Sequence, residues 1–384
     1  MTERRGGLGF GRRDGDAVAS AGSRGLAPGK AERPWPEGAV RLDDDIVGAL
    51  LPERGFRGHK GSFGRLLVIA GSLDYAGAAL LVCRAAGRAG VGLVTLAIPE
   101  SLQPLFAAKV VEATTMGLPE DDVEEIDPEG ALARILDHEH DALVLGPGLR
   151  PGLSTTELVR ELIATGGERD PAPIVLDAEA LRSLASMSGW WEGDRRAAVL
   201  TPHTGEFGRL RAGSDRDPEA DGDLIDDDDA RVASTSDAAT SWRQVVVLKG
   251  ARTVIAAPDG SVAIAPFENP GLATGGTGDV LSGVIGALLA QGLDPFAAAR
   301  LGVYLHGAAG DAVRERLGDA GLLASDLPDA LAIARKRLAA AAERRREGRR
   351  LGFAARTSGV VPPGPSAPWA PGAKPIDPAR PDPA

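Results

Sequence analysis

Runs of consecutive apolar residues alternate with Ala-rich stretches of helical periodicity through the middle of the chain. Six of the runs have the length and β-branched content of buried strands, at residues 65–71, 92–98, 141–146, 173–178, 197–202 and 245–250. Strands that are apolar on both faces are typical of a parallel sheet covered by helices on both sides. The pattern therefore predicts an α/β fold with a mostly parallel central sheet.

The pattern changes after the sixth run. Two short apolar segments in TVIAAPDGSVAIAP are joined by Pro-Asp-Gly, which predicts a β-hairpin at one edge of the sheet. Apolar residues with helical spacing follow over 279–291 and from 295 to about 316. Two helices are therefore expected to complete the fold.

Composition divides the chain into three parts. Residues 1–40 are rich in Gly, Arg, Ala and Ser without sustained periodicity, and we expect them to be disordered. Residues 41–340 form the predicted globular domain, which carries an acidic loop insertion at 211–231. Residues 341–384 are first basic and then Pro-rich, with nine prolines from Val361 onward, and form a predicted disordered tail.

Charge and cysteine content exclude several classes of function. The net charge of −11, from 43 basic and 54 acidic residues, argues against a non-specific nucleic-acid-binding protein. The single cysteine, Cys83, cannot form an internal disulfide, so nothing indicates an oxidising compartment. No segment has the ~18 consecutive apolar residues of a membrane helix, and the Arg-rich N-terminus lacks the apolar segment of an export signal. We therefore expect a cytoplasmic protein without nucleic-acid or membrane partners.

Polar and Gly-rich segments follow nearly every predicted strand. In chain order they are GSLDYAGAA, GPGL, DAEAL, TPHTGEF and KGART. The carboxyl ends of parallel strands meet at one edge of a sheet, where open α/β folds bind their ligands. These segments are therefore expected to surround one crevice.

The segment NPGLATGGTGD, residues 269–279, leads directly into the first of the two C-terminal helices. Its glycines allow successive backbone N–H groups to point into one concavity, and the helix adds the positive end of its dipole. The segment is therefore a predicted anion hole for phosphate oxygens. Neither a GxxxxGK[ST] P-loop nor a GxGxxG dinucleotide motif is present.

Asp279, at the end of this segment, has two interpretations. A carboxylate stabilises a helix start through the dipole, or it orients or deprotonates a hydroxyl for attack on phosphorus. Ser or Thr would begin the helix equally well without bringing a negative charge next to a phosphate. The sequence therefore favours a role for Asp279 in phosphoryl transfer.

The chain resembles the ADP-dependent NAD(P)H-hydrate dehydratase family of the ribokinase-like superfamily, from about His59 to about Leu327. The resemblance is carried, in order, by HKGSFGRLLVIAGSLDYAGAA, LGPGL, LDAEAL, LTPHTGEFGRL, VVLKGARTVI, NPGLATGGTGDVLSG and LGVYLHGAAGD. It implies a hydro-lyase of nicotinamide-nucleotide repair. Such an enzyme uses ADP to convert the S epimers of the hydrates NADHX and NADPHX to NADH and NADPH, releasing AMP and phosphate. Phosphate leaves the ring far more easily than hydroxide, which explains why a nucleotide is consumed.

The resemblance also implies which residues form the site. Asp279 is the implied catalytic residue and faces the substrate hydroxyl. The implied substrate-binding residues are Ala78, Gly148, His203 and Asp279. The implied nucleotide-binding residues are Lys249, Gly250, Ala251, Arg252, Thr253, Gly275, Gly276, Thr277 and Gly278. Mg²⁺ is expected on the phosphates of ADP, without a set of protein ligands of its own.

Further implications concern partners and domains. A homo-oligomer is expected, with a tetramer favoured. Many relatives are fused to an N-terminal epimerase domain that interconverts the two hydrate epimers, whereas only about 40 residues of disordered composition precede the motifs here. We therefore expect a stand-alone dehydratase that works downstream of a separate epimerase.

Several alternatives stay open at this stage. Kinases of vitamin-precursor alcohols, such as hydroxymethylpyrimidine or hydroxyethylthiazole, share the fold and the anion hole, but TPHTGEF and GSLDYAGAA argue against this interpretation. A non-catalytic nucleotide sensor would have no need of Asp279. Asp177 suits either a Mg²⁺-bound water or the fixing of its own loop, whereas His306 and Asp311 are interpreted as packing and hydrogen-bonding residues. The preference between NADHX and NADPHX is open as well.

Overall fold

The computed structural model describes residues 34–165, 172–212 and 227–357, and its globular unit begins at Pro36. Its main strands are β1 (Val40–Arg41), β2 (Arg65–Ile69), β3 (Leu93–Pro99), β4 (Thr114–Leu118), β7 (Ala142–Leu145), β8 (Ile174–Leu176), β9 (Ala198–Leu200), β10 (Val245–Leu248), β11 (Val254–Ala256) and β12 (Val262–Ile264). Within these described residues they form one ten-stranded sheet, in the order β1-β12-β11-β10-β9-β8-β7-β2-β3-β4. All neighbouring pairs are parallel except the two that contain β11. The mostly parallel sheet expected from the apolar runs is confirmed.

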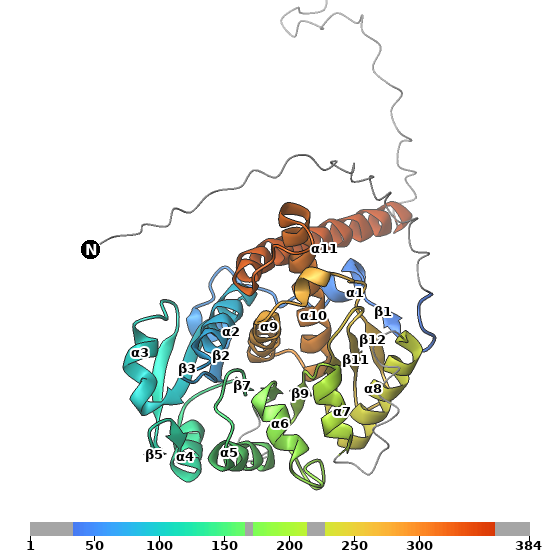
Figure 1. Cartoon of the computed structure of the whole chain (residues 1–384). Coiled ribbons are helices and arrows are strands. Elements are labelled where there is room, and N and C mark those ends of the chain that lie inside the picture. Colours follow the sequence, from blue (N-terminus) through green and yellow to red (C-terminus); the bar gives the residue numbers. More distant parts are fainter. Residues whose placement is uncertain (1–33, 166–171, 213–226, 358–384) are drawn as a thin grey trace, which may run out of the picture. The chain divides into compact units, whose positions relative to one another are not determined.

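Helices cover both faces of this sheet (Figure 1). One layer contains α2 (Ala76–Ala89), α9 (Thr277–Ala290) and α10 (Pro295–Leu317), with α1 (Asp44–Gly48) and α11 (Leu327–Thr357) packed outside it. The other layer contains α5 (Leu153–Ala164), α6 (Glu179–Ala185), α7 (Thr204–Ala212) and α8 (Asp228–Trp242). Two further helices, α3 (Gln103–Ala107) and α4 (Pro128–Asp137), lie toward the β4 edge, where β5 (Glu120–Asp122) and β6 (Glu125–Ile126) form a small separate hairpin. No helix of the described part of the chain is long and apolar enough to cross a membrane.

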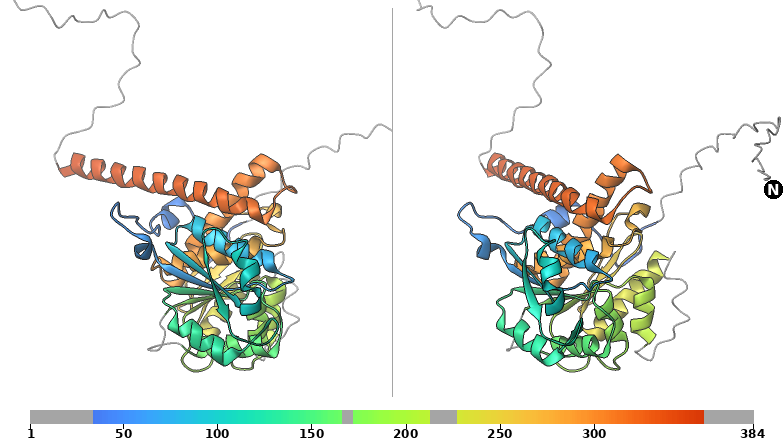
Figure 2. Two further views of the ribbon diagram at one scale, coloured as in Figure 1. Left: turned by 90° about the vertical axis from the view of Figure 1, so that its left-hand side faces the viewer. Right: turned by 60° about the vertical axis from the view of Figure 1, so that its left-hand side comes forward.

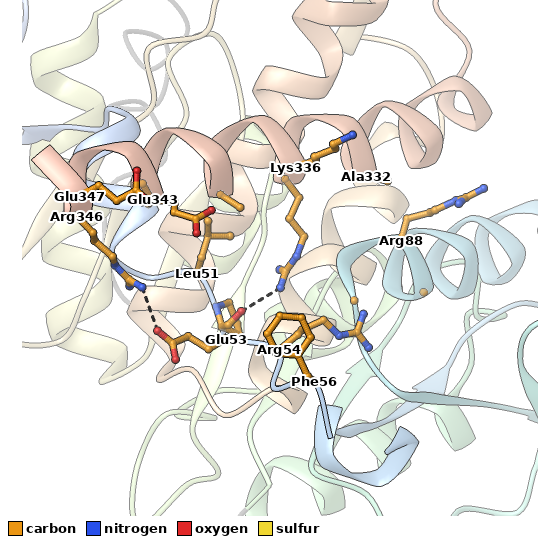
Figure 3. Close-up of a pocket in the computed structure, with 17 residues that line it drawn as sticks. Leu51, Glu53, Arg54, Phe56, Arg88, Ala332, Lys336, Glu343, Arg346 and Glu347 are labelled. Atoms are coloured by element: carbon orange, nitrogen blue, oxygen red, sulfur yellow. Dashed lines mark hydrogen bonds and ion pairs between the residues drawn. The ribbon is translucent and has the colours of Figure 1, made fainter. Parts of the chain in front are cut away.

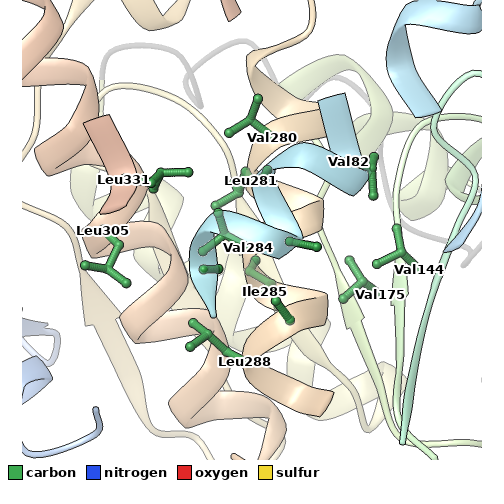
Figure 4. Close-up of a cluster of buried hydrophobic side chains, with 14 of the residues drawn as sticks. Val82, Val144, Val175, Val280, Leu281, Val284, Ile285, Leu288, Leu305 and Leu331 are labelled. Carbon is green, nitrogen blue, oxygen red and sulfur yellow. The ribbon is translucent and has the colours of Figure 1, made fainter. Parts of the chain in front are cut away.

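The small apolar residues of α9 explain how this helix lies close to its neighbours (Figure 4). A Cβ on Gly283 would lie 2.4 Å from the carbonyl oxygen of Val82 in α2, and a Cβ on Gly286 would lie 2.4 Å from Val144 of β7. Larger side chains at either position would push α9 off the sheet. Val284 and Ile285 fill the remaining space and are fully buried, each contributing about 1.5–3 kcal/mol of burial free energy. This packing fixes where α9 begins, and therefore where Asp279 lies.

Three features differ from the expectations or extend them. The hairpin of β11 and β12 is confirmed, but β1 pairs outside it and is the true edge. The last helix, α11, continues without a break to Thr357, past residue 340, where the domain was expected to end (Figure 2). The ends of the expected loop 211–231 are helical: α7 reaches Ala212 and α8 begins at Asp228, while residues 213–226 lie outside the described residues.

Candidate active site

A glycine turn places Asp279 in the first turn of α9, on the side of the sheet where the parallel strands end. Gly276, the N-cap residue, has a left-handed backbone with φ of 91°. A Cβ there would also lie 2.8 Å from Leu81, so only glycine fits. Gly275 is exposed, and a Cβ on it would meet no atom within 4 Å. The space at Gly275, directly before the N-terminus of α9, is therefore open, which suits an anion at the helix start.

Buried side chains hold this turn from behind. The hydroxyl of Thr277 lies 2.7 Å from the carbonyl oxygen of Leu272, and His306 Nε2 lies 2.9 Å from the carbonyl oxygen of Thr277. Burial lowers the pKa of His306 to about 4, so the ring is neutral and donates through Nε2–H. Asp311 accepts a hydrogen bond from the Asn269 amide at 3.0 Å. The local hydrogen-bonding roles expected for His306 and Asp311 are confirmed.

An ion pair lies beneath the glycine turn. Lys249 follows β10, and its Nζ donates to Oδ1 of Asp177, which follows β8, at 2.9 Å. The side chain of Asp177 is only 2% exposed and that of Lys249 is 19% exposed. A Cβ on Gly278 would lie 3.4 Å from Lys249 Nζ, so glycine lets the ammonium group approach the start of α9. The loops after β8 and β10 and the turn before α9 therefore meet, as the strand-end pattern predicts.

The carboxylate of Asp177 is fully engaged within the protein. Ser282 donates its hydroxyl to Oδ2 at 2.6 Å, and the backbone N–H of Ala178 donates to Oδ1 at 2.9 Å. Burial by itself raises the pKa of Asp177, but the Lys249 charge and hydrogen bonds from Ser282, Lys249 and Thr201 outweigh burial and hold the pKa below its usual value. Of the two roles left open for Asp177, the geometry favours the fixing of loops over binding of a Mg²⁺-bound water.

The pKa of Asp279 is shifted in the opposite direction to the pKa of Asp177. Burial, and then the negative charge of Asp177, raise the pKa of Asp279 to about 7, and the charge of Lys249 offsets this only in part. For Lys249, burial lowers the pKa, but the carboxylates of Asp177, Glu206 and Asp279 hold it above its usual value. Lys249 therefore stays charged at neutral pH while Asp279 exchanges a proton there. Two carboxylates with divergent pKa values are typical of acid–base catalysis.

His203 directly precedes α7, at the rim of this group. Its Nδ1 accepts a hydrogen bond from the backbone N–H of Gly205 at 3.0 Å, so the ring proton sits on Nε2. Glu206 accepts from the backbone N–H of His203 at 2.9 Å and also lies 3.8 Å from Lys249 Nζ. The imidazole is 54% exposed. His203 therefore has a structural role in starting the helix and presents its Nε2 edge near Glu206 at the crevice.

Ala78 and Gly148, two of the implied substrate-binding residues, lie against each other. A Cβ on Gly148, where φ is 67°, would lie 2.8 Å from the Cβ of Ala78 and 2.7 Å from the Tyr75 carbonyl oxygen. Close approach therefore requires small residues at both positions. Next to them, Leu73 and Tyr75 are apolar side chains with 59% and 60% exposure, a feature the sequence analysis missed.

The segment 250–253 is built around buried charges. Gly250 has a φ of 152° and lies against Arg231, whose Nη2 donates to the Leu248 carbonyl oxygen at 3.1 Å. Arg252 is 5% exposed and pairs with Asp228 at 3.1 Å and Glu268 at 2.5 Å. The Arg252 side chain is therefore occupied by ion pairs. A nucleotide contact here would come from Lys249, directly before the segment, or from Ala251, which is exposed, and Thr253, which is partly exposed.

Ser282 is a further site residue that the sequence analysis missed. It lies three positions after Asp279 in an otherwise apolar stretch of α9, so both side chains project from the same face of the helix. A single hydroxyl in such a run was the available signal. Its partner Asp177 is 105 positions away, and only the folded sheet brings the two together.

Comparisons with known proteins agree with this geometry. The sequence model of the NAD(P)H-hydrate dehydratase family matches residues 66–332. The chain is 44% identical over 288 residues to a bifunctional NAD(P)H-hydrate repair enzyme of Moorella thermoacetica, covering 73% of the chain and 51% of that protein. It is 35% identical over 283 residues to an ADP-dependent (S)-NAD(P)H-hydrate dehydratase of Neisseria meningitidis, covering 73% of the chain and 88% of that protein. The chain thus spans about half the length of the bifunctional relatives.

Among solved structures, the chain is similar to the ADP/ATP-dependent NAD(P)H-hydrate dehydratase of Bacillus subtilis, co-crystallised with ATP and Mg²⁺. The TM-score is 0.65 at 32% identity, over 79% of this chain and 99% of the other. The match confirms the expected ribokinase-like fold.

Proposed function

Because the chain belongs to the NAD(P)H-hydrate dehydratase family, we propose that it dehydrates the S epimers of NADHX and NADPHX, with ADP as co-substrate. Hydration removes a double bond of the nicotinamide ring, and the reaction restores it. The products are NADH or NADPH, AMP and phosphate. The observation that carries the proposal is the half-buried Asp279, with a pKa of about 7, directly beside an open helix N-terminus.

In the first step Asp279 takes the proton of the ring hydroxyl. The hydroxyl oxygen then attacks the β-phosphorus of ADP, a new P–O bond forms, the bond to the bridging oxygen breaks, and AMP leaves. In the second step the ring C–O bond breaks and phosphate departs. The departing phosphate takes a proton from the neighbouring ring carbon, and the double bond forms.

The remaining residues position and stabilise charge. The backbone N–H groups at the start of α9 would hold phosphate oxygens, and the ammonium of Lys249 would add positive charge beneath them. The described residues contain no group of three or more His, Cys, Asp or Glu side chains arranged for a metal ion. Mg²⁺, which the resemblance implies, would be held by the phosphates of ADP and would neutralise their charge.

Conversion of a mixture of hydrate epimers tests this proposal. With ADP and Mg²⁺, purified protein should regenerate NADH from the S epimer until that epimer is exhausted, leaving the R epimer, and omission of ADP should abolish the reaction. Adding a separate epimerase should then allow the R epimer to be consumed. Phosphorylation of a pyrimidine or thiazole alcohol, with ATP converted to ADP and no NADH formed, would instead support the kinase alternative.

The pKa of Asp279 gives a pH dependence. Its folded-state pKa is raised, so the carboxyl group is protonated below about pH 7 and cannot accept the hydroxyl proton. We expect kcat/KM, which reports the free enzyme, to fall about tenfold per pH unit below that pKa. Steady-state kinetics between pH 5 and 9 measure the profile. A kcat/KM that stays constant down to pH 5 would show that the base is another group.

A homo-oligomeric state, a tetramer in particular, and a cytoplasmic location remain predictions. The exposed Leu73 and Tyr75 beside Ala78 support the first, because apolar side chains at a crevice rim suit contact with substrate or with a second subunit. Sedimentation analysis measures the oligomeric state, and cell fractionation measures the location.

A further inference from the structure

A cavity of about 860 Å³ lies away from the glycine turn, between α11, the C-terminal end of α2 and the segment 51–56 (Figure 3). Its wall includes Arg54 and Arg335, from the segment and from α11, and the apolar side chains of Leu51, Pro52 and Phe56. The volume is in the range of cavities that hold small ligands. None of the residues assigned to the dehydratase site lines it.

Four arginines line this cavity, and two of them, Arg88 and Arg346, pair with carboxylates. The other two, Arg54 and Arg335, have no carboxylate partner within salt-bridge distance among the residues that the structure describes. Arg335 donates from Nη2 to the Pro52 carbonyl oxygen at 3.3 Å, while its Nη1 is buried without a hydrogen-bond partner. Burial, and then the nearby charge of Arg54, lower the pKa of Arg335. Two adjacent cations, one with an unsatisfied buried donor, are costly unless an anion lies between them.

The acidic residues of the cavity wall do not supply an anion between Arg54 and Arg335. Glu53 pairs with Arg346 at 3.0 Å. Figure 3 shows Glu343 and Glu347 beside Arg346 at one end of the cavity, whereas Arg54 and Lys336 lie farther along it. One end of the cavity therefore carries both acidic and basic side chains, and the other, the cationic end, carries basic side chains.

An aromatic ring lies at the cationic end. Phe56 is one of the residues that line the cavity, and it is fully exposed to solvent. The Arg54 guanidinium lies 4.0 Å above the centre of the Phe63 ring, and this contact fixes the plane of the guanidinium. The guanidinium N–H groups lie in that plane and remain free to point outward. A free aromatic face next to two guanidinium groups suits a ligand that combines a planar ring with an oxyanion.

We propose that this cavity is a second ligand site, which binds a small molecule carrying both a phosphate group and a planar ring, as a nucleotide does. Arg54 and Arg335 bind the phosphate through their N–H forks, and Phe56 stacks on the ring. The site lies outside the dehydratase crevice and does not depend on the reaction proposed there.

Calorimetric titration of the full chain tests the site. The probes are AMP, inorganic pyrophosphate and adenosine, titrated into wild-type protein and into Arg335→Gln, Arg54→Gln and Arg337→Gln. Arg337 lies on the same helix outside the cavity and is exposed, so its change is a matched loss of charge. Melting temperatures show whether each variant is folded, and Arg54 lies on an exposed segment where its loss cannot unfold the core.

Wild-type protein should bind AMP at two sites per chain. Arg335→Gln and Arg54→Gln should each weaken one of the two about tenfold or more, whereas Arg337→Gln should weaken neither. Pyrophosphate should bind the same site more weakly than AMP, and adenosine should not bind it. A single AMP site in wild-type protein, or two sites that neither cavity variant affects, would overturn the proposal. Equal affinity for pyrophosphate and AMP would overturn the role of Phe56.

Discussion

Replacing Asp279 by Asn is expected to lower kcat by about 10²–10⁴-fold while ADP still binds. The amide retains the shape of the carboxylate and its place in α9, but it cannot take the hydroxyl proton. Rapid measurement of NADH formation with ADP and the S hydrate gives kcat, and calorimetric titration gives ADP affinity. The pH dependence of the residual rate should also lose its inflection near 7, where Asp279 titrates.

Asp294→Asn is the matched control for this experiment. Asp294 is also an acidic residue at a helix start, and its carboxylate accepts the backbone N–H of Ala297 at 2.9 Å as the N-cap of α10. Asn caps a helix as well as Asp, so this variant should keep full activity. If Asp279→Asn retained more than about a tenth of wild-type kcat, Asp279 would be a helix-start residue like Asp294.

Lys249→Met is expected to cost about 3 kcal/mol or more of stability in addition to activity. The change leaves the Asp177 carboxylate, 2% exposed, without its main counter-charge, and breaking a buried pair from one side typically costs that much. Thermal unfolding should show a melting temperature lower by about 2–4 °C per kcal/mol. Because Lys249 lowers the folded-state pKa of Asp177, the stability it contributes is present at neutral pH and is lost as pH falls through that pKa. The difference from wild type should therefore be present at pH 7 and should shrink as pH falls below the usual aspartate pKa of 3.8.

Two control variants distinguish the loss of the ion pair between Lys249 and Asp177 from the loss of any lysine. Lys109→Met removes an exposed lysine just after α3 and should change neither stability nor kcat. Adding Asp177→Asn to Lys249→Met removes the buried charge and should recover part of the stability, but not the activity. Equal melting temperatures for wild type and Lys249→Met at pH 7 would show that the ion pair between Lys249 and Asp177 does not stabilise the fold.

The fold was largely predictable because its strands are buried on both faces. Such strands appear as continuous apolar runs, and all six runs are strands of the sheet. The edge strands were harder to predict, because neither contains an apolar run. Both residues of β1 are exposed, and β4 begins with two threonines. The helix α11 was not predicted, because the tail from residue 341 was judged by its basic and Pro-rich composition, whereas helical propensity continues through AAAAERRREG.

The candidate site was predictable only in part. The convergence of strand-end loops followed from the parallel sheet, and it brings Lys249, Asp177 and the glycine turn together. Contacts between residues far apart in the sequence, such as Ser282 with Asp177, leave no pattern in one sequence. The burial of Arg252 was hidden as well, because an arginine in a loop is usually solvated, and here Asp228 and Glu268 neutralise it.

The central claim is that this chain couples the splitting of ADP to the dehydration of a nicotinamide hydrate. The most direct test follows NADH absorbance and AMP release in one reaction with the S hydrate, ADP and Mg²⁺. One AMP and one phosphate should be released for each NADH formed, and all three products should be lost together in Asp279→Asn. NADH formed without AMP would contradict the coupling. Failure to form NADH with either ADP or ATP, with phosphorylation of a pyrimidine or thiazole alcohol instead, would contradict the function.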